Sequence, residues 1–234
     1  MRFMGVIGGM GPLATADFLA KLVRYAPAKT DQANVPVIVY GDCTVPDRTA
    51  CVASDGPSPL PKLLADVEFF NRVGVSALCV PCNTAHHWHA EMQEASTVPV
   101  LHIVRASVEL ASSNRPRLHS LGVLSTYGTH RMGIYRQAIE ELGLEVIEPT
   151  EDEFETLVSH GIALTKANRV EEASEVFGAA ADRLLARGAE SVILGCTEIP
   201  LGMERQLRER PDQFVDSNEA PARAVVAAYY GEAE

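Results

Sequence analysis

The chain has 234 residues, of which 47% are hydrophobic and 22% are charged, a composition typical of a folded globular protein and not of a disordered or fibrous one. Its 20 Lys and Arg residues stand against 31 Asp and Glu residues, and the formal net charge of −11 argues against nucleic acid and anionic membrane surfaces as partners. No apolar run approaches the roughly 20 residues that cross a bilayer, so no membrane-spanning segment is predicted.

Short apolar runs alternate with helix-length amphipathic segments, the pattern of an α/β protein with a mostly parallel sheet. Strands are predicted at residues 3–7, 35–40, 77–80, 100–102, 121–124, 145–147, 191–194 and 214–215. Helices are predicted at residues 14–25, 60–73, 85–95, 104–112, 130–142, 169–187 and 220–230. The sixth helix has the clearest predicted ends, with Asn168 as N-cap, Glu171 three residues later and Gly188 after the last turn.

Two stretches of sequence recur at nearly equal spacings. Gly5-Val6-Ile7-Gly8 returns 117 residues later as Gly122-Val123-Leu124-Ser125, and residues 77–84 return 114 residues later as residues 191–198. The second pair places a cysteine, Cys82 or Cys196, just past the carboxyl end of a strand, where open α/β sheets bind ligands. The alternative is chance similarity between two buried strands, in which free cysteine is common.

These repeats predict two pseudo-symmetric α/β domains, each with a mostly parallel sheet. The first is expected to contain residues 1–102 plus about 213–234, with Cys82, and the second about 103–212, with Cys196. Two such domains would leave a cleft between them, and we predict the active site in that cleft with one cysteine on each wall.

The loop Gly9-Met10-Gly11-Pro12-Leu13-Ala14 formally fits the dinucleotide fingerprint between a strand and a helix. Pro12 lacks the backbone N–H that a pyrophosphate would need. The nearest acidic residue after a second strand, Asp42, also lies later than the usual spacing of about 20 residues. The simpler interpretation is a glycine loop that lets a small anionic ligand approach backbone amides.

The cysteines and histidines around residue 82 allow several interpretations. Cys79-x-x-Cys82 could be a redox pair, but Cys79 falls inside the apolar strand, so we predict a structural Cys79 and a functional Cys82. A zinc site formed by Cys82 with His86, His87 and His89 is an alternative that lacks a second pair of ligands. Exposed histidines on the first turn of a helix are the preferred interpretation, and no metal site is predicted.

The compartment is also indicated by the sequence. Five cysteines, an odd number in a chain of this size, favour a reducing cytoplasm in which thiols stay free. The N-terminus superficially imitates a secretory signal that ends at Ala14-Thr15-Ala16, but glycines and Pro12 interrupt its apolar part. No cleaved leader is therefore expected.

Two cysteines across one cleft suit a specific reaction. Inverting an amino acid at its α-carbon needs one base and one acid on opposite sides of that carbon, and a thiolate and a thiol can do this without a cofactor. Because Cys82 and Cys196 both precede a predicted helix N-terminus, we expect the helix dipole and free N–H groups to lower the pKa of each thiol.

Five ordered motifs extend over nearly the whole chain. They are Gly8-Gly9-Met10-Gly11-Pro12 with Ala14-Thr15, Pro46-Asp47-Arg48-Thr49, Pro81-Cys82-Asn83-Thr84-Ala85-His86, Ser125-Thr126-Tyr127-Gly128-Thr129 followed by Tyr135, and Gly195-Cys196-Thr197-Glu198. With these motifs the chain resembles the cofactor-independent aspartate/glutamate racemase superfamily, most closely its aspartate racemase branch. The resemblance implies two pseudo-symmetric α/β domains, as the repeats suggest independently, and a homodimer.

The resemblance implies that Cys82 and Cys196 are the two catalytic bases, one for each enantiomer. Arg48 looks like the residue that grips a substrate carboxylate, and Lys166 falls where the family carries a second cation, a pair that suits a dicarboxylate amino acid. Without the resemblance, Arg48 would be interpreted as a solvent-facing loop residue and Lys166 as a charge near a helix end. The predicted substrate-binding residues are Met10, Arg48, Asn83, Thr84, Thr126, Thr129, Lys166, Thr197 and Glu198. Asn83 and the threonines would donate hydrogen bonds to the α-carboxylate and the developing enediolate, and Met10 would border the pocket.

Two departures from the family pattern bear on the substrate. Glutamate racemases carry an acidic residue in the first loop where this chain has Gly8-Gly9-Met10, and a histidine after the second Cys-Thr where this chain has Glu198, so glutamate specificity is disfavoured. Many relatives also carry a histidine near the C-terminus, where this chain has Asp216-Ser217-Asn218-Glu219-Ala220-Pro221. The second departure leaves the substrate range open.

The sequence therefore predicts a cytoplasmic amino-acid racemase, with aspartate as the first-choice small-molecule substrate, that works without pyridoxal phosphate or another cofactor. One alternative is an enzyme of the same fold with another substrate: a hydantoin racemase, a maleate isomerase or an arylmalonate decarboxylase. The last two would use one cysteine as nucleophile or acid. The other alternative is a protein that binds an amino acid without converting it.

Overall fold

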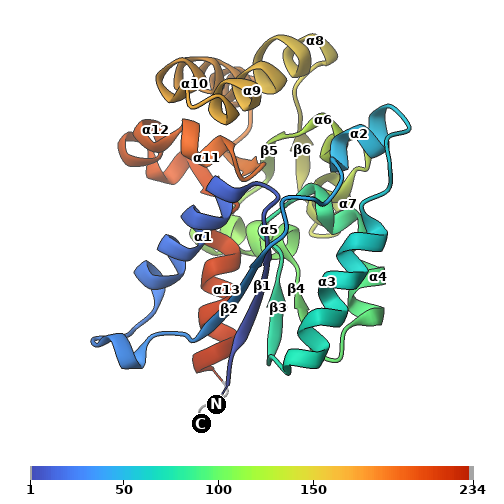
Figure 1. Ribbon diagram of the computed structural model, residues 1–234. Helices are drawn as coiled ribbons and strands as arrows, with labels where there is room; N and C mark the ends of the chain where they lie inside the picture. Colours follow the sequence, from blue (N-terminus) through green and yellow to red (C-terminus); the bar gives the residue numbers. More distant parts are fainter. Residues whose placement is uncertain (1, 232–234) are drawn as a thin grey trace. The chain divides into compact units, whose positions relative to one another are not determined.

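A computed structural model describes residues 2–231 of the chain (Figure 1). Within these residues the chain divides into two compact units. The first contains residues 2–106 and 218–231, and the second contains residues 107–217. Helix α5 (Ile103–Asn114) carries the chain from the first unit into the second.

The first unit is built on a four-stranded parallel sheet with the strand order β2-β1-β3-β4. Its strands are β1 (Met4–Gly8), β2 (Val37–Gly41), β3 (Ala77–Cys79) and β4 (Val100–Leu101). Its helices are α1 (Pro12–Tyr25), η1 (Asp31–Ala33), α2 (Arg48–Ala53), α3 (Leu60–Val73), η2 (Thr84–Trp88), α4 (His89–Ala95) and α13 (Glu219–Tyr230). All pairs in this sheet are parallel, so the carboxyl ends of its strands lie along one edge.

Both faces of this sheet are covered by helices, which explains why its strands are apolar on both sides. Ile7 and Leu78 are buried in a cluster with residues of α3 and α4, whereas Val6 and Cys79 are buried in a cluster with residues of α1 and α13. Figure 1 shows α1 and α13 on one side of the sheet and α3 and α4 on the other. Cys79 is therefore a core residue, as the sequence predicted.

The second unit repeats this arrangement, with the parallel strand order β6-β5-β7-β8. Its strands are β5 (Ser120–Ser125), β6 (Glu145–Ile147), β7 (Ser191–Gly195) and β8 (Phe214–Asp216). Its helices are α6 (Tyr127–Arg131), α7 (Ile134–Glu140), α8 (Glu151–Glu153), η3 (Phe154–Ser159), α9 (His160–Lys166), α10 (Val170–Ala186), α11 (Ile199–Gly202), α12 (Glu204–Glu209) and η4 (Pro211–Gln213). Strand β5 takes the place of β1 and strand β7 that of β3, so the two sequence repeats fall on equivalent strands.

The core of the second unit forms where α10 packs on its sheet. Phe177 and Leu184 of α10 are fully buried in one cluster with Leu124 of β5 and Leu194 of β7. The same cluster includes Val158 of η3, a π-helical turn that joins α8 to α9 without a break. Residues 151–166 thus form one continuous helical segment that ends at Lys166.

The predicted α/β class and the eight predicted strands are confirmed. Two predicted helices are divided in the structure, residues 85–95 into η2 and α4, and residues 130–142 into α6 and α7 at Gly133. The helical segment 151–166 was not predicted. The prediction of Asn168 as the N-cap of α10 is wrong, because Asn168 has φ +59° and follows the end of α9, and Arg169 takes the N-cap position.

Candidate active site

Cys82 lies three residues after the end of β3, and both polar groups of its backbone are hydrogen-bonded. Its N–H donates to the carbonyl of Val80 at 2.8 Å, and its carbonyl accepts a hydrogen bond from Nδ1 of His86 at 2.8 Å. The residue is buried, with 5% of its surface exposed. Asn83 and Thr84, which follow it at the start of η2, are also buried. The structure therefore brings three predicted site residues into one buried turn at the carboxyl edge of the first sheet.

Arg48 joins this region to the loop after β1. It is the first residue of α2, whose N-cap Asp47 accepts a hydrogen bond from Ala50 N–H at 2.8 Å. The Arg48 guanidinium donates to the carbonyls of Met10 at 3.2 Å and of Pro46 at 3.1 Å. Met10 is buried in the same apolar cluster as Cys82. Arg48 is therefore half-buried against backbone, not a solvent-facing loop residue.

The glycine loop after β1 is shaped by close packing. Gly9 has φ +90°, and a Cβ at this position would lie 2.5 Å from the carbonyl carbon of Asp42, so only glycine fits. Its N–H donates to Oγ1 of Thr15 at 3.0 Å. The N–H that a phosphate-binding loop would offer is thus already engaged by the protein, which further weakens the dinucleotide interpretation.

A pair of buried aspartates lies next to this loop. The Lys62 ammonium, 2.8 Å from Asp42, and hydrogen bonds from Thr44 lower the pKa of Asp42 to about 2. Burial, together with the charge of Asp42, raises the pKa of Asp66 to about 6. The pKa of Asp42 is therefore lowered and the pKa of its neighbour Asp66 is raised.

Cys196 follows β7 directly and is buried to the same extent as Cys82. Its thiol donates a hydrogen bond to Oε2 of Glu198 at 3.1 Å, and Thr197 Oγ1 donates to the same oxygen at 3.3 Å. Burial and the adjacent Glu198 carboxylate raise the pKa of Cys196 well above its ordinary value. The prediction of a lowered pKa is wrong for Cys196, because burial and the Glu198 carboxylate outweigh the lowering effects of the Glu198 backbone N–H and of Lys166.

Tyr135 packs against the residue before this cysteine. A Cβ on Gly195 would lie 2.7 Å from the Tyr135 ring, so glycine is required for the ring to approach. Tyr135 is buried, its hydroxyl is hydrogen-bonded to Ser107, and burial raises its pKa. The Tyr135 ring therefore packs against the Cys196 turn, and its hydroxyl keeps its proton at neutral pH.

Thr126 and Thr129 follow β5, the strand next to β7. Ser125 pairs with Gly195 in the sheet register, so Thr126 and Cys196 leave the sheet at the same level. Thr126 caps α6 by accepting a hydrogen bond from Thr129 N–H at 3.1 Å, and the two hydroxyls lie 2.9 Å apart. Both predicted binding residues are thus in the vicinity of Cys196 within the second unit.

Lys166 reaches the same region from the end of α9. Its positive charge lowers the pKa of Cys196, although burial and Glu198 raise that pKa by more. Lys166 therefore lies within electrostatic range of the thiol.

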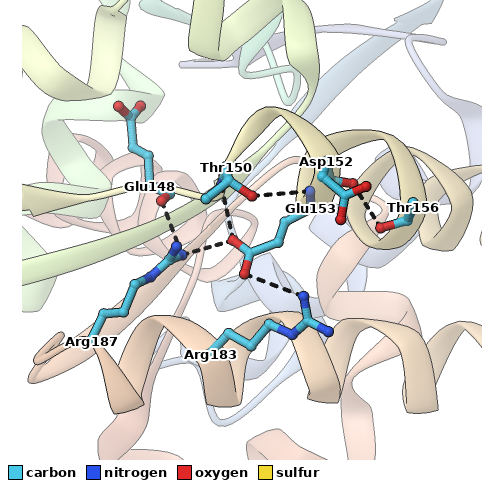
Figure 2. Close-up of polar contacts among 7 residues, drawn as sticks. All are labelled: Glu148, Thr150, Asp152, Glu153, Thr156, Arg183 and Arg187. Carbon is cyan, nitrogen blue, oxygen red and sulfur yellow. Dashed lines mark hydrogen bonds and ion pairs between the residues drawn. The ribbon is translucent and has the colours of Figure 1, made fainter.

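The helical segment that ends at Lys166 is anchored at its other end, as Figure 2 shows. There Thr150 and Glu153 form a reciprocal capping box, and Glu153 accepts hydrogen bonds from Arg187 at 2.9 Å and Arg183 at 3.4 Å.

The histidines after Cys82 differ from one another. His87 is exposed, as predicted, but His86 is buried and His89 is half-buried, so the prediction of exposed histidines is wrong for these two. The rings of His86 and His89 stack on each other, and both lie tilted against the ring of His102. Within the described residues, no three His, Cys, Asp or Glu side chains converge as they would around a metal ion.

No helix in residues 2–231 is long and apolar enough to cross a membrane.

A family model described as Asp/Glu/Hydantoin racemase matches residues 7–225. The chain belongs to this racemase family. Members of the family share its fold closely: Picrophilus torridus aspartate racemase superposes with a TM-score of 0.86 at 26% identity, covering 98% of this chain and 95% of that one. The predicted superfamily, fold and isomerase class are thereby confirmed.

Two relatives by sequence cover most of the racemase chain. It is 26% identical over 232 residues to the broad specificity amino-acid racemase RacX of Bacillus subtilis (strain 168), covering 97% of each chain. It is 29% identical over 217 residues to glutamate racemase of Deinococcus radiodurans, covering 88% of this chain and 68% of that protein. The names of these two relatives thus state different substrates, a broad range of amino acids for one and glutamate for the other.

Two features of the site were missed by the sequence analysis. One is the burial of His86 against Cys82, for which the only sequence signal was its place in the Cys82 motif. The other is the hydrogen bond from Cys196 to Glu198, which the spacing Cys-Thr-Glu could have suggested, because a side chain two positions on can fold back over a tight turn.

Proposed function

We propose that the chain is an amino-acid racemase that works without a cofactor, with Cys82 and Cys196 as its two bases and aspartate as the first substrate to test. One observation carries this proposal: in each unit a buried cysteine follows the third strand, and the two sheets have the same strand order. The equivalence supports a reaction that treats the two faces of one carbon alike.

In the proposed reaction, the thiolate of one cysteine takes the proton from the α-carbon. The electron pair of the broken C–H bond passes into the α-carboxylate and forms an enediolate. The thiol of the other cysteine then gives its proton to the opposite face, so that a new C–H bond forms and the two cysteines exchange protonation states. The proposal requires both thiols to reach the same α-carbon.

The remaining predicted residues receive roles in binding. Arg48, whose guanidinium donates to the carbonyls of Met10 and Pro46, would bind a substrate carboxylate, and Lys166 would add a second positive charge. Asn83, Thr84, Thr126, Thr129 and Thr197 would donate hydrogen bonds to the α-carboxylate and the enediolate. Met10, in the apolar cluster of Cys82, would border the substrate.

Glu198, predicted as a substrate contact, has a further role in this proposal. A thiol whose pKa is raised needs a proton acceptor before it can act as a base, and Glu198 Oε2 already accepts the hydrogen bond of that thiol. Glu198 would take the proton from Cys196 Sγ and return it when Cys196 acts as the acid.

The choice of aspartate rests on the structural likeness to an aspartate racemase at a TM-score of 0.86. Sequence identity does not separate aspartate from glutamate, so the substrate must be measured.

The test is proton NMR of the reduced protein in D₂O with L-aspartate, L-glutamate and a panel of other L-amino acids, followed by chiral analysis. Loss of the Cα–H signal together with the appearance of the D-enantiomer would support the proposal and identify the substrate. No exchange with any amino acid would contradict it, and 5-substituted hydantoins, maleate and arylmalonates would be tested next. Thermal stabilisation by an amino acid without exchange would indicate a binding protein.

The organisation of the molecule is part of the same proposal. We propose that the two compact units are two domains, one with Cys82 and one with Cys196; the sequence boundary near residue 213 is shifted to 217, because β8 pairs with β7 in the second sheet. We also propose a homodimer in the cytoplasm, where its five free cysteines would stay reduced. Light scattering coupled to gel filtration measures the mass in solution, and a mass of one 25.3 kDa chain would contradict the dimer.

A further inference from the structure

His86 is a buried side chain for which the reaction described above has no use. It lies in η2 with 2% of its surface exposed. Its Nδ1 is 2.8 Å from the carbonyl of Cys82, and its Nε2 is 3.1 Å from the N–H of Ile103 at the start of α5. The ring thus lies between the backbone of Cys82 and the first turn of a helix.

The neighbours of the ring determine its tautomer. The Cys82 carbonyl, 2.8 Å from Nδ1, can only accept, so the ring proton lies on Nδ1. Nε2 of the neutral ring then accepts from the N–H of Ile103 at 3.1 Å and does not donate to the Leu101 carbonyl, which lies farther away at 3.3 Å. Nδ1 then donates to the Cys82 carbonyl. Burial, next to His89, lowers the pKa of His86 to about 4, so the ring is neutral near pH 7 and keeps this pair of hydrogen bonds.

These contacts fix the backbone from which the Cys82 thiol projects. The N–H of Cys82 is held by Val80 and its carbonyl by His86, so neither adjacent peptide plane can rotate without breaking a buried hydrogen bond. At Cys196 the carbonyl accepts from the backbone N–H of Ile199 at 2.9 Å, in the tight turn that leads into α11. The first cysteine therefore depends on a side chain for a contact that the second receives from the backbone.

We propose that His86 is a positioning residue for Cys82, and that it aims the thiol by holding the Cys82 carbonyl through Nδ1–H. This inference rests on the proposed role of Cys82 as a base. Proton transfer requires the sulfur and the α-carbon to meet at a defined distance and angle, and a displacement of about 1 Å can cost on the order of a hundredfold in rate. Loss of this hydrogen bond is therefore expected to act on kcat more than on KM.

Three variants test the proposal. In His86→Asn the side-chain amide nitrogen replaces Nδ1 and can still donate to Cys82, whereas in His86→Gln the amide lies at the level of Nε2. We expect His86→Gln to lower kcat about 10- to 100-fold with KM changed less than about threefold, and His86→Asn to restore most of kcat. His89→Gln is the matched control, since His89 stacks on His86 but bonds to Val100, and its kcat should stay near that of the native protein.

A second measurement does not depend on racemisation. Iodoacetamide labels cysteines, and mass spectrometry of the peptides gives the labelling rates of Cys82 and Cys196 in the same molecule. We expect the ratio of the two rates to change in His86→Gln and to return in His86→Asn. If no substrate is racemised but this ratio changes as described, the positioning role holds and the proposed function fails.

Two results would overturn the inference. One is equal loss of kcat in His86→Asn, His86→Gln and His89→Gln with an unchanged labelling ratio, which would indicate only a structural role. The other comes from the native protein, so it does not depend on how any variant folds. Nitrogen-15 NMR of the histidine rings identifies the protonated nitrogen, and a proton on Nε2 of His86 at pH 7 would contradict the hydrogen bond to Cys82.

Discussion

The turns that follow β3 and β7 occupy equivalent places in their sheets, yet they hold their cysteines in different ways. At Cys82 the backbone is fixed by a side chain, since His86 donates to its carbonyl. At Cys196 the thiol itself is fixed, because Glu198 accepts its hydrogen. Within the described part of the first unit, no carboxylate accepts a hydrogen bond from the Cys82 thiol.

The difference shows that duplicated architecture does not require duplicated chemistry. Equal strand order places a cysteine at the same point in each unit, but the residue two positions later is Thr84 in one and Glu198 in the other. In the proposed reaction Cys196 passes its proton to Glu198, whereas Cys82 is followed by no carboxylate at the matching position. The two half-reactions of a racemase would then respond differently to substitution.

The largest effect is expected from the cysteines themselves. Cys82→Ala and Cys196→Ala should each lower the racemisation rate about 10²- to 10⁴-fold, because each removes one of the two groups that transfer the proton. Chiral analysis of aspartate over time provides the measurement, and Cys43→Ala, at an exposed cysteine, is the matched control. Near-normal turnover in either cysteine variant would exclude the two-base assignment.

Glu198→Gln tests the asymmetry directly. Removing the carboxylate should lower the pKa of Cys196 and so speed its alkylation at pH 8, because a negative charge next to the thiolate is lost. Racemisation should nevertheless slow about 10- to 100-fold, since the proton acceptor is also lost. Glu204→Gln, at an exposed position on α12, serves as control. Faster racemisation together with faster alkylation would show that Glu198 only restrains the thiol.

Arg48→Lys is expected to act on binding in the first unit. Lysine keeps the charge but cannot hold the Met10 and Pro46 carbonyls and a carboxylate in one plane. We expect KM for aspartate to rise about tenfold with a smaller change in kcat, as initial rates over a range of substrate concentrations would show. Arg24→Lys on α1 is the control. An unchanged KM would remove Arg48 from the substrate contacts.

The smallest effect concerns stability and pH. Asp66 is 3% exposed and has its pKa raised to about 6, mainly by burial, so in the folded chain it binds a proton at pH values where the unfolded chain has lost it. Stability from this group is present at low pH and is lost as the pH rises through 6. Asp66→Asn should therefore raise the free energy of unfolding by about 1 to 2 kcal/mol at pH 8 and little at pH 4. Urea denaturation at both pH values measures it, with Asp31→Asn as control, and an equal change at both would contradict the titration.

The strands could be predicted because each is a short, mostly apolar run, and the central strands β1, β3, β5 and β7 are buried throughout. The segment 151–166 could not, because its sequence carries Glu151, Asp152, Glu153 and Glu155 with a π-helical turn that shifts the apolar period. Asn168 fitted an N-cap pattern, but asparagine also tolerates the left-handed conformation that ends a helix. Local sequence alone does not decide between these two uses.

Within the site, the cysteines could be predicted and their environments could not. Cys82 and Cys196 follow recognisable strands, so sequence places them at the edges of the sheets. The burial of His86 depends on β4 and α5, which contribute the carbonyl of Leu101 and the N–H of Ile103. The pKa of Cys196 likewise depends on burial and on the Glu198 carboxylate, which together raise it.

The anchor in Figure 2 has a mechanical consequence for the far end of its helix. The 16 residues from Glu151 to Lys166 form a rod about 24 Å long, held at its first turn by Glu153, Arg183 and Arg187. Because Phe154, Val158 and Ile162 also pack into the core of the second unit, the segment is held along its length and not at one end alone. Glu153, Arg183 and Arg187 thus help to fix the position of Lys166 from about 24 Å away.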